Sequence, residues 1–282
     1  MMDMKQEIIY FLSEGSLHYV SHYTSLERFK QICENQTLRM GQLNNVNDFD
    51  ELQHPGLNID LSGIDRSGSK VSELADKISS SIYNTYDCNV VVACFSKNNY
   101  RNGHITASDT SFGNNVLWGT YAKNLGGVAL VFDPNLLQKQ IESYFGEIDS
   151  NNIIYSNDIN YTNGPGSRIH IHSIEVAAKP FEGNSEEEFK LLTHITTAAH
   201  AQHLLFNKRE MWSPEKEWRV IAVSQNKGPH FIPYGDALKA VVIGPRAHTD
   251  PRTIAKAVGC PVFTIGKAGN RPEIDLLDPL GR

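Results

Sequence analysis

The chain has 282 residues, of which 40% are hydrophobic and 21% are charged, and its formal net charge at pH 7 is −6. This composition is typical of a globular protein with one large domain or two small ones. It contains no long run of Lys or Arg, which excludes the charge pattern of a strong non-specific nucleic-acid binder. Because neither a signal-peptide layout nor a membrane-length apolar run is present, we expect a cytoplasmic protein without membrane contact.

The four cysteines are Cys33, Cys88, Cys94 and Cys260. They are scattered along the chain without Cys-x-x-Cys spacing, so we expect reduced and mostly buried thiols. This spacing also gives no reason to expect a zinc site built from cysteines.

The N-terminal part predicts a strand, a helix and a second strand. Leu17 to Tyr23 is rich in Tyr and Val and indicates the first strand. Thr24 and Ser25 are suitable helix N-caps, and Glu27 follows Thr24 at capping-box spacing. We expect the helix from Leu26 to Asn35 and a short strand at Leu38-Arg39-Met40.

Two continuous apolar runs in the middle of the chain predict buried strands, at residues 89–96 and 128–132. Between them, residues 97–115 are polar and contain glycine, which is typical of a mobile loop that covers a site. A short helix is expected from Val116 to Ala122, closed by the turn at Gly126-Gly127.

The C-terminal half predicts further helices and strands without a strict βαβ rhythm. We expect helices at 185–207 and 250–258, and strands at 219–223, 231–234, 238–244 and 262–265. Pro233 makes the strand at 231–234 a candidate edge strand, because proline cannot donate to a ladder. This mixture favours the α+β class and a single domain over residues 1–282.

The segment Trp212 to Val223 places Glu215 and Glu217 at the start of an apolar run. If the segment is extended, residues i and i+2 point to the same face, and the two carboxylates lie side by side. Such a pair can bind two hydroxyls of one substrate, or act as an acid and its helper. The alternative is an exposed strand end with solvated charges and an ion pair to Arg219.

Two further groups offer polar or aromatic contacts to a ligand. His22, at a strand end, can donate to a carbonyl or a ribose hydroxyl, or it can simply pack at a strand edge. Trp118 and Tyr121 share one helix face and can stack on a planar ring, or they can be a core contact between helix and sheet.

A histidine group gives a third hypothesis, a metal-dependent hydrolase. His170 and His172 share a face if their segment is a strand, and His200 and His203 share a helix face, with His194 nearby in sequence. Two such pairs can form a transition-metal site, although no acidic ligand accompanies them.

Four segments together resemble one bacterial family, the domain of unknown function 2971. They are the start His22-Tyr23-Thr24-Ser25 with the loop at 43–48, then Cys94-Phe95-Ser96, then residues 117–128, and last residues 215–219. The C-terminal strand with Gly244-Pro245 also fits this family. The resemblance covers residues 17 to 246 and by itself implies no reaction.

The same order of residues resembles the His-Tyr-Glu type of ADP-ribosyltransferase, with His22, Tyr121 and Glu217 at the matching positions. The resemblance implies split mixed or antiparallel β-sheets flanked by helices, with an inserted helical segment at about 135–210 and a C-terminal extension at 247–282. It also implies NAD as co-substrate. In the sister class with a Glu-x-Glu motif the first Glu positions the acceptor, and Glu215 matches it. Cys94-Phe95-Ser96 only partly matches the Ser-x-Ser of that class.

The resemblance therefore implies a set of site residues. Glu217 and Glu215 are the candidate catalytic residues. The candidate NAD-binding residues are His22, Tyr23, Thr24, Ser96, Trp118 and Tyr121. Cleavage of the nicotinamide–ribose bond passes through an oxocarbenium-like state, so the protein must hold the leaving ring, fix the ribose and place a carboxylate against positive charge.

We therefore expect an NAD-dependent ADP-ribosyltransferase-like enzyme that modifies a protein or nucleic-acid acceptor. Analogy with the class suggests a toxin or anti-phage defence effector, with an antitoxin or regulatory protein as a further partner. The alternatives are a non-catalytic binding or regulatory module on the same scaffold, and the metal-dependent hydrolase.

Overall fold

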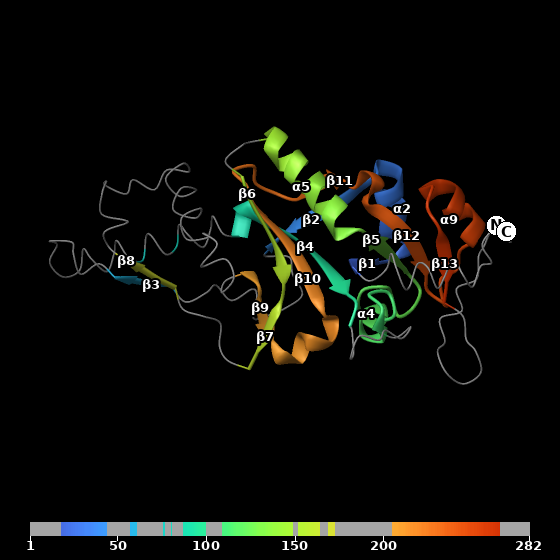
Figure 1. Cartoon of the computed structure of the whole chain (residues 1–282), viewed down its shortest axis with the longest axis horizontal. Coiled ribbons are helices and arrows are strands. Elements are labelled where there is room, and N and C mark those ends of the chain that lie inside the picture. The colour runs from blue at the N-terminus through green and yellow to red at the C-terminus, as the bar shows by residue number, and fades with distance from the viewer. Residues whose placement is uncertain are drawn as a thin grey trace.

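The computed structural model describes residues 18–43, 57–60, 76, 80, 87–99, 109–148, 152–163, 169–172 and 205–265, with the backbone alone at 57–60 and 169–172. Helices and strands are interspersed along the chain around a mostly antiparallel sheet, so the expected α+β class is confirmed (Figure 1).

The main sheet has nine strands. Seven follow the order β11-β2-β4-β1-β5-β12-β13, β10 pairs with β4, and β6 pairs with β10. The only parallel pair in this sheet is β12 with β13. The bounds are β1 Val20–Thr24, β2 Thr37–Gln42, β4 Val90–Lys97, β5 Val128–Phe132, β6 Ile153–Asp158, β10 Glu217–Val223, β11 His230–Pro233, β12 Leu238–Ile243 and β13 Val262–Thr264. Pro233 lies on an edge strand, as expected from its missing N–H.

The sheet divides at β4. One edge of this strand pairs with β10 over 90–96. On its other edge, β2 pairs with 91–92 and β1 pairs with 96–97. Residues 93–95 lie between these two partners, and no strand in the described part of the chain pairs with them on that edge. The division leaves a space between β1 and β2, and this space positions the candidate site.

Four more strands form two small parallel pairs outside the main sheet. They are β3 Leu57–Asp60 with β8 Ile169–His172, and β7 Asn160–Thr162 with β9 Asn207–Arg209. We expected an inserted helical segment at 135–210. Within this stretch, β6 is a strand of the main sheet, and the helix α5 Pro134–Ile148 packs against the same core. Residues 164–168 and 173–204 lie outside the described part.

Helices cover both faces of the sheet. The bounds are α2 Leu26–Asn35, α4 Asn115–Thr120, α5 Pro134–Ile148 and α9 Pro251–Val258, with the 3₁₀ helices η5 Glu210–Glu215 and η6 Gly235–Ala237. Phe29 of α2, Ile141 of α5 and Ile254 of α9 pack in one apolar cluster. Trp118 of α4 packs in another cluster, against Val131 and Val242. Because alternate strand residues face opposite sides, these two clusters lie on opposite faces of β5 and β12.

The structure decides one local expectation and corrects two. Of the two expected N-caps of α2, Ser25 is the one used, and its hydroxyl accepts from the Arg28 N–H. Glu215 ends the 3₁₀ helix η5 instead of lying in a strand with Glu217. Asn207 begins strand β9, so the expected helix at 185–207 does not extend to its predicted end; residues 185–204 lie outside the described part.

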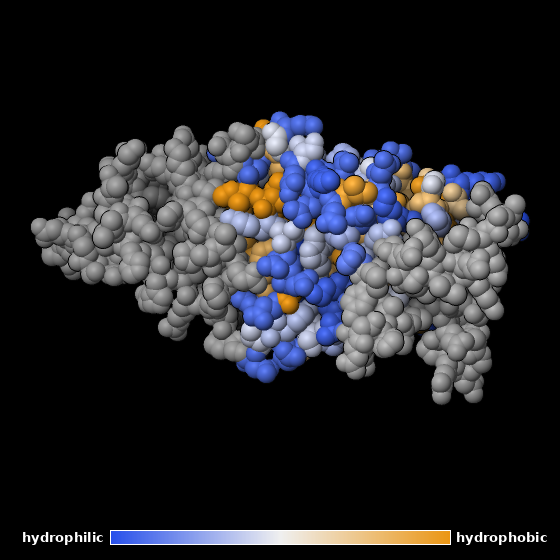
Figure 2. Space-filling view, in the orientation of Figure 1, coloured by the Kyte–Doolittle hydropathy of each residue, from blue (hydrophilic) through white to orange (hydrophobic). Residues whose placement is uncertain are grey.

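The described residues on the face in Figure 2 are mostly hydrophilic, with a hydrophobic patch beside α5 over the beginning of β6. In the described part of the chain, no helix is both long enough and apolar enough to cross a membrane.

Candidate functional site

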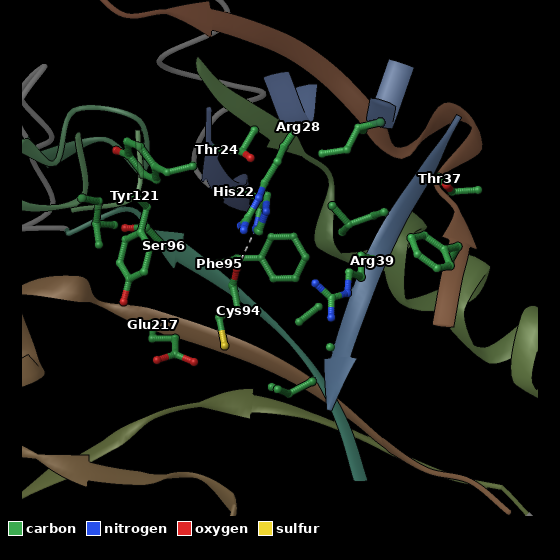
Figure 3. A pocket seen from close by; sticks show the side chains of 18 of the residues that line it. His22, Thr24, Arg28, Thr37, Arg39, Cys94, Phe95, Ser96, Tyr121 and Glu217 are labelled. Carbon is green, nitrogen blue, oxygen red and sulfur yellow. Dashed lines mark hydrogen bonds between the residues drawn. The ribbon is translucent and has the colours of Figure 1, made fainter. Parts of the chain in front are cut away.

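A cavity of about 810 Å³ lies where the sheet divides. Its walls come from β1, α2, β2, the middle of β4, the end of α4 and the segment around Glu215 (Figure 3). This volume lies within the range of ordinary small-molecule sites, about 300–1,000 Å³. The cavity is therefore large enough to be a candidate ligand site.

The cavity brings together residues from distant parts of the sequence. Seven of the eight residues predicted from the sequence line it: His22, Tyr23, Thr24, Ser96, Tyr121, Glu215 and Glu217. The convergence required of a single site is therefore present for these seven, although their roles stay predictions.

His22 lies at the centre of the division, on a central strand and not at a sheet edge. Its Nδ1 lies 3.1 Å from the carbonyl oxygen of Cys94, which lies on β4 between the residues paired with β1 and those paired with β2. A carbonyl only accepts, so Nδ1 carries the proton, and Nε2 of the neutral ring is left as an acceptor. Burial lowers the pKa of His22, the hydrogen bond to Cys94 opposes this shift, and the charge of Arg28 lowers the pKa further. His22 is therefore neutral at pH 7.

Glu215 is buried and contacts two groups. Its Oε1 accepts a hydrogen bond of 2.8 Å from the Tyr121 hydroxyl, and its Oε2 lies 2.9 Å from the Lys208 ammonium. Tyr121 is half-buried and lines the cavity, and its hydroxyl is held by Glu215.

Glu217 is 3% exposed and contacts two cations. Its Oε1 lies 2.6 Å from Arg219 Nε, and its Oε2 lies 2.8 Å from Lys208 Nζ. Burial alone would raise the pKa of Glu217, but Arg219, Lys208 and a hydrogen bond from Cys94 lower it to about 2. Glu217 is therefore ionised throughout the physiological range. The interpretation of this segment as solvated charges at an exposed strand end is wrong, although its ion pair with Arg219 is present.

The backbone around the acidic pair explains why both carboxylates reach one cation. Lys216, between them, has φ 49° and ψ 51°, a left-handed conformation that ends η5 and turns the chain into β10. The Ser96 hydroxyl donates to the Glu215 carbonyl, and the Lys97 N–H donates to the Lys216 carbonyl. The Glu217 N–H donates to the Tyr161 hydroxyl. The pair is thus fixed by a turn and not by strand alternation.

The structure does not bring Trp118 and the Tyr23 ring to the cavity. Trp118 is 1% exposed, packs edge-on against Tyr23, and donates from Nε1 to the Phe112 carbonyl. Tyr23 borders the cavity, but strand alternation turns its side chain away from that of His22, and its hydroxyl donates to the Ser111 carbonyl. Both rings are therefore core contacts between helix and sheet, which was the alternative interpretation of Trp118.

Several residues of the cavity were missed by sequence reasoning. Lys208 bridges the two carboxylates from strand β9, and its ammonium also lies 5.3 Å from the Trp212 ring centroid. Arg28, Arg39 and Phe231 line the cavity as well. No sequence pattern identified Lys208 as a site residue, because its two carboxylate partners are brought to it by a turn. Arg39 was predicted only as part of a short strand.

Parts of two other predictions lie outside the described residues. Residues 100–108 of the proposed covering loop are among these. The two described residues that flank them are joined by a hydrogen bond from the Asn99 N–H to the Asp109 carbonyl. His194, His200 and His203 are also outside. Among the described residues, no three His, Cys, Asp or Glu side chains are grouped as metal ligands.

Comparison with known proteins gives one match. Residues 117–220 match the model of a family described as a protein of unknown function, DUF2971. This stretch includes Tyr121, Lys208, Glu215 and Glu217, whereas His22, Arg28 and Arg39 precede it. No curated protein and no solved structure gives a significant match.

Proposed function

We propose that this protein binds NAD in the divided-sheet cavity and transfers its ADP-ribose to an acceptor. The observation that carries the proposal is that His22, Tyr121 and the Glu215 and Glu217 pair, which come from three separate segments, line one cavity. These residue types match the three tasks of the reaction, which are holding the leaving ring, fixing the ribose and stabilising positive charge.

Each residue has a defined role in this proposal. Nicotinamide packs against the half-buried ring of Tyr121, and Nε2 of His22 accepts a hydrogen bond from a ribose hydroxyl. Glu217 remains anionic and stabilises the positive charge that develops as the nicotinamide–ribose C–N bond breaks. Nicotinamide leaves as a neutral ring with the electron pair of that bond. The acceptor then bonds to the ribose C1′, and its proton passes to Glu215 or to water.

The test is nicotinamide release and label transfer from labelled NAD, with protein and nucleic-acid acceptors supplied in separate reactions. We expect activity in the unchanged chain and a loss of at least about 100-fold in Glu217→Gln, the range in which removal of one charge-stabilising group falls. Glu142→Gln is the matched control, because Glu142 is exposed on α5 and does not line the cavity.

Glu217→Gln also removes a buried charge from two cations, so the folding of the variant must be measured by circular dichroism and thermal unfolding. Tyr121→Phe provides a milder second variant, because it keeps the ring and removes only the hydrogen bond to Glu215. If the unchanged protein neither binds NAD nor releases nicotinamide with any acceptor, the proposal is wrong.

A second candidate is a binding module without catalysis. It is favoured by the ion pairs of Glu217 with Arg219 and Lys208, because a carboxylate engaged by two cations has less capacity to contact a ribose. NAD binding without nicotinamide release, unchanged in Glu217→Gln, supports this candidate over the transferase.

A further inference from the structure

Two arginines line the cavity, and neither has an anionic partner within the described part of the chain. Arg28 and Arg39 both extend into the cavity in Figure 3, and neither guanidinium forms an ion pair among the described residues. Lys208 and Arg219, by contrast, are each ion-paired to a carboxylate. The positive charge of the cavity is therefore balanced at the Glu217 end and unbalanced at the end formed by α2 and β2.

Arg28 lies on α2 and lines the cavity together with His22. Its charge contributes to the lowered pKa of His22, so the two side chains interact electrostatically. An anion bound to Arg28 would lie next to the neutral His22 ring. A guanidinium is suited to this role, because its fork of N–H donors matches phosphate oxygens and it remains charged at all relevant pH values.

An exposed aromatic ring completes this end of the cavity. Phe231 is 54% exposed and lies directly opposite Arg39 in the antiparallel pair of β11 with β2. Side chains at such positions project from the same face with Cβ atoms about 4.5–5.5 Å apart. No ring or cation–π contact to Phe231 is present among the described residues, so its face is open to a planar group.

We propose that this end of the cavity is a nucleoside-diphosphate subsite, in which Arg28 and Arg39 bind the phosphates and Phe231 stacks on the base. The inference deepens the proposed function, on which it rests for the identity of the whole ligand. It gives NAD one orientation, with the nicotinamide half toward Tyr121 and Glu217 and the ADP half toward α2, β2 and β11. Stacking on Phe231 can hold the base, because every nucleobase has a planar face.

The test is titration of ADP into the full chain by calorimetry. We expect ADP to bind, and binding to weaken by about tenfold or more in Arg39→Met and in Arg28→Met, since a charged phosphate contact contributes at least that much. Phe231→Ala should weaken ADP binding by a similar factor while leaving inorganic pyrophosphate binding unchanged. Binding should also weaken as salt increases.

Lys30→Met is the matched control, because Lys30 is an exposed cation on α2 that does not line the cavity. It should leave ADP affinity within twofold of the unchanged chain. Arg28, Arg39 and Phe231 are all exposed, so their variants should fold, which circular dichroism checks. A chain that does not bind ADP, or variants that all bind it equally, would overturn the subsite.

The subsite and the transferase can fail separately. If ADP binds with the expected dependence on Arg28, Arg39 and Phe231 but NAD is never cleaved, the subsite stands and the transferase is wrong. If NAD is cleaved with dependence on Glu217 but these three variants leave the KM for NAD unchanged, the transferase stands and the subsite is wrong.

Discussion

At the scale of single residues, the ionised state of Glu217 links the site to the stability of the fold. The pKa of Glu217 is lowered from 4.5 to about 2, so the folded state binds this proton less readily than the unfolded chain. A lowered carboxyl pKa gives stability that is present above the unfolded value and is lost as the pH falls toward the folded value. The ion pairs of Glu217 with Lys208 and Arg219 therefore contribute their full stabilisation to the fold near neutral pH.

We predict that the free energy of unfolding falls by a few kcal/mol between about pH 5 and pH 2 through this group. Glu217→Gln should be less stable at pH 7 and should lose less stability on acidification. Urea unfolding at a series of pH values measures both effects, with Glu142→Gln as the control for an exposed carboxyl. Parallel pH profiles for the unchanged chain and Glu217→Gln would contradict the ion-pair account.

Trp118 and Tyr121 were expected to share one task, and the structure separates them. Trp118→Phe removes a buried N–H donor and should lower the free energy of unfolding by about 1–3 kcal/mol, because the hydrogen bond from Trp118 Nε1 to the Phe112 carbonyl is lost. The affinity for NAD or ADP should not change. Tyr121→Ala removes a ring that lines the cavity and should weaken NAD binding. A calorimetric titration of both variants checks this. An equal loss of affinity in the two variants would show that Trp118 contributes to ligand binding.

At the scale of elements, the turn that follows α4 holds β5 close to the end of β1. A Cβ added to Gly127 would lie 2.1 Å from the Thr24 carbonyl oxygen and 3.0 Å from the Ala122 Cα, both backbone atoms. Such contacts are relieved only by moving a strand. Glycine at this position therefore sets the distance between β5 and the part of β1 that borders the cavity.

We predict that Gly127→Ala lowers the free energy of unfolding by about 1–3 kcal/mol or more, as overpacking does. It should also weaken ligand binding, because Thr24 lines the cavity. Gly119→Ala is the control, since a Cβ at that position on α4 meets no atom within 4 Å. That variant should be as stable as the unchanged chain or up to about 1 kcal/mol more stable. Equal thermal midpoints for the two variants would argue against a close approach at Gly127.

At the scale of the whole molecule, the sequence predicted the elements better than their arrangement. Continuous apolar runs marked β4, β5 and β12, because strands buried on both faces need apolar side chains throughout. The pattern of apolar and polar residues could not show that β1 and β2 share one edge of β4, because the pairing partners of a strand are determined by tertiary packing. The cavity depends on that division, so its position did not follow from local pattern.

The sequence predicted that His22 and Glu217 converge, and both line the cavity. It did not predict Lys208, whose partners are reached through the left-handed turn at Lys216 and through the pairing of β7 with β9. The proximity of Glu215 and Glu217 was also predicted, but for a wrong local reason. A turn brings both carboxylates to one cation, whereas a regular strand was expected to do so.

The topology of the main sheet also predicts the order in which it opens. Strand β5 is paired on both edges, and all five of its residues are fully buried. Strand β11 is an edge strand with alternate residues exposed, and β13 pairs with one neighbour over three residues. Opening free energies rise from nearly zero at exposed edges to the global value in the core.

We predict that amide hydrogens of β5 exchange slowest and that those of β11 and β13 exchange orders of magnitude faster, as read by hydrogen-exchange mass spectrometry. Strands β1 and β4 should be protected at the residues that pair with neighbouring strands. Saturation with ADP should slow exchange in β2 and β11, because it binds across that pair, and should leave β13 unchanged as an internal control. Equal protection of β11 and β5 without ligand would contradict the sheet order, and an ADP effect confined to β13 would contradict the subsite.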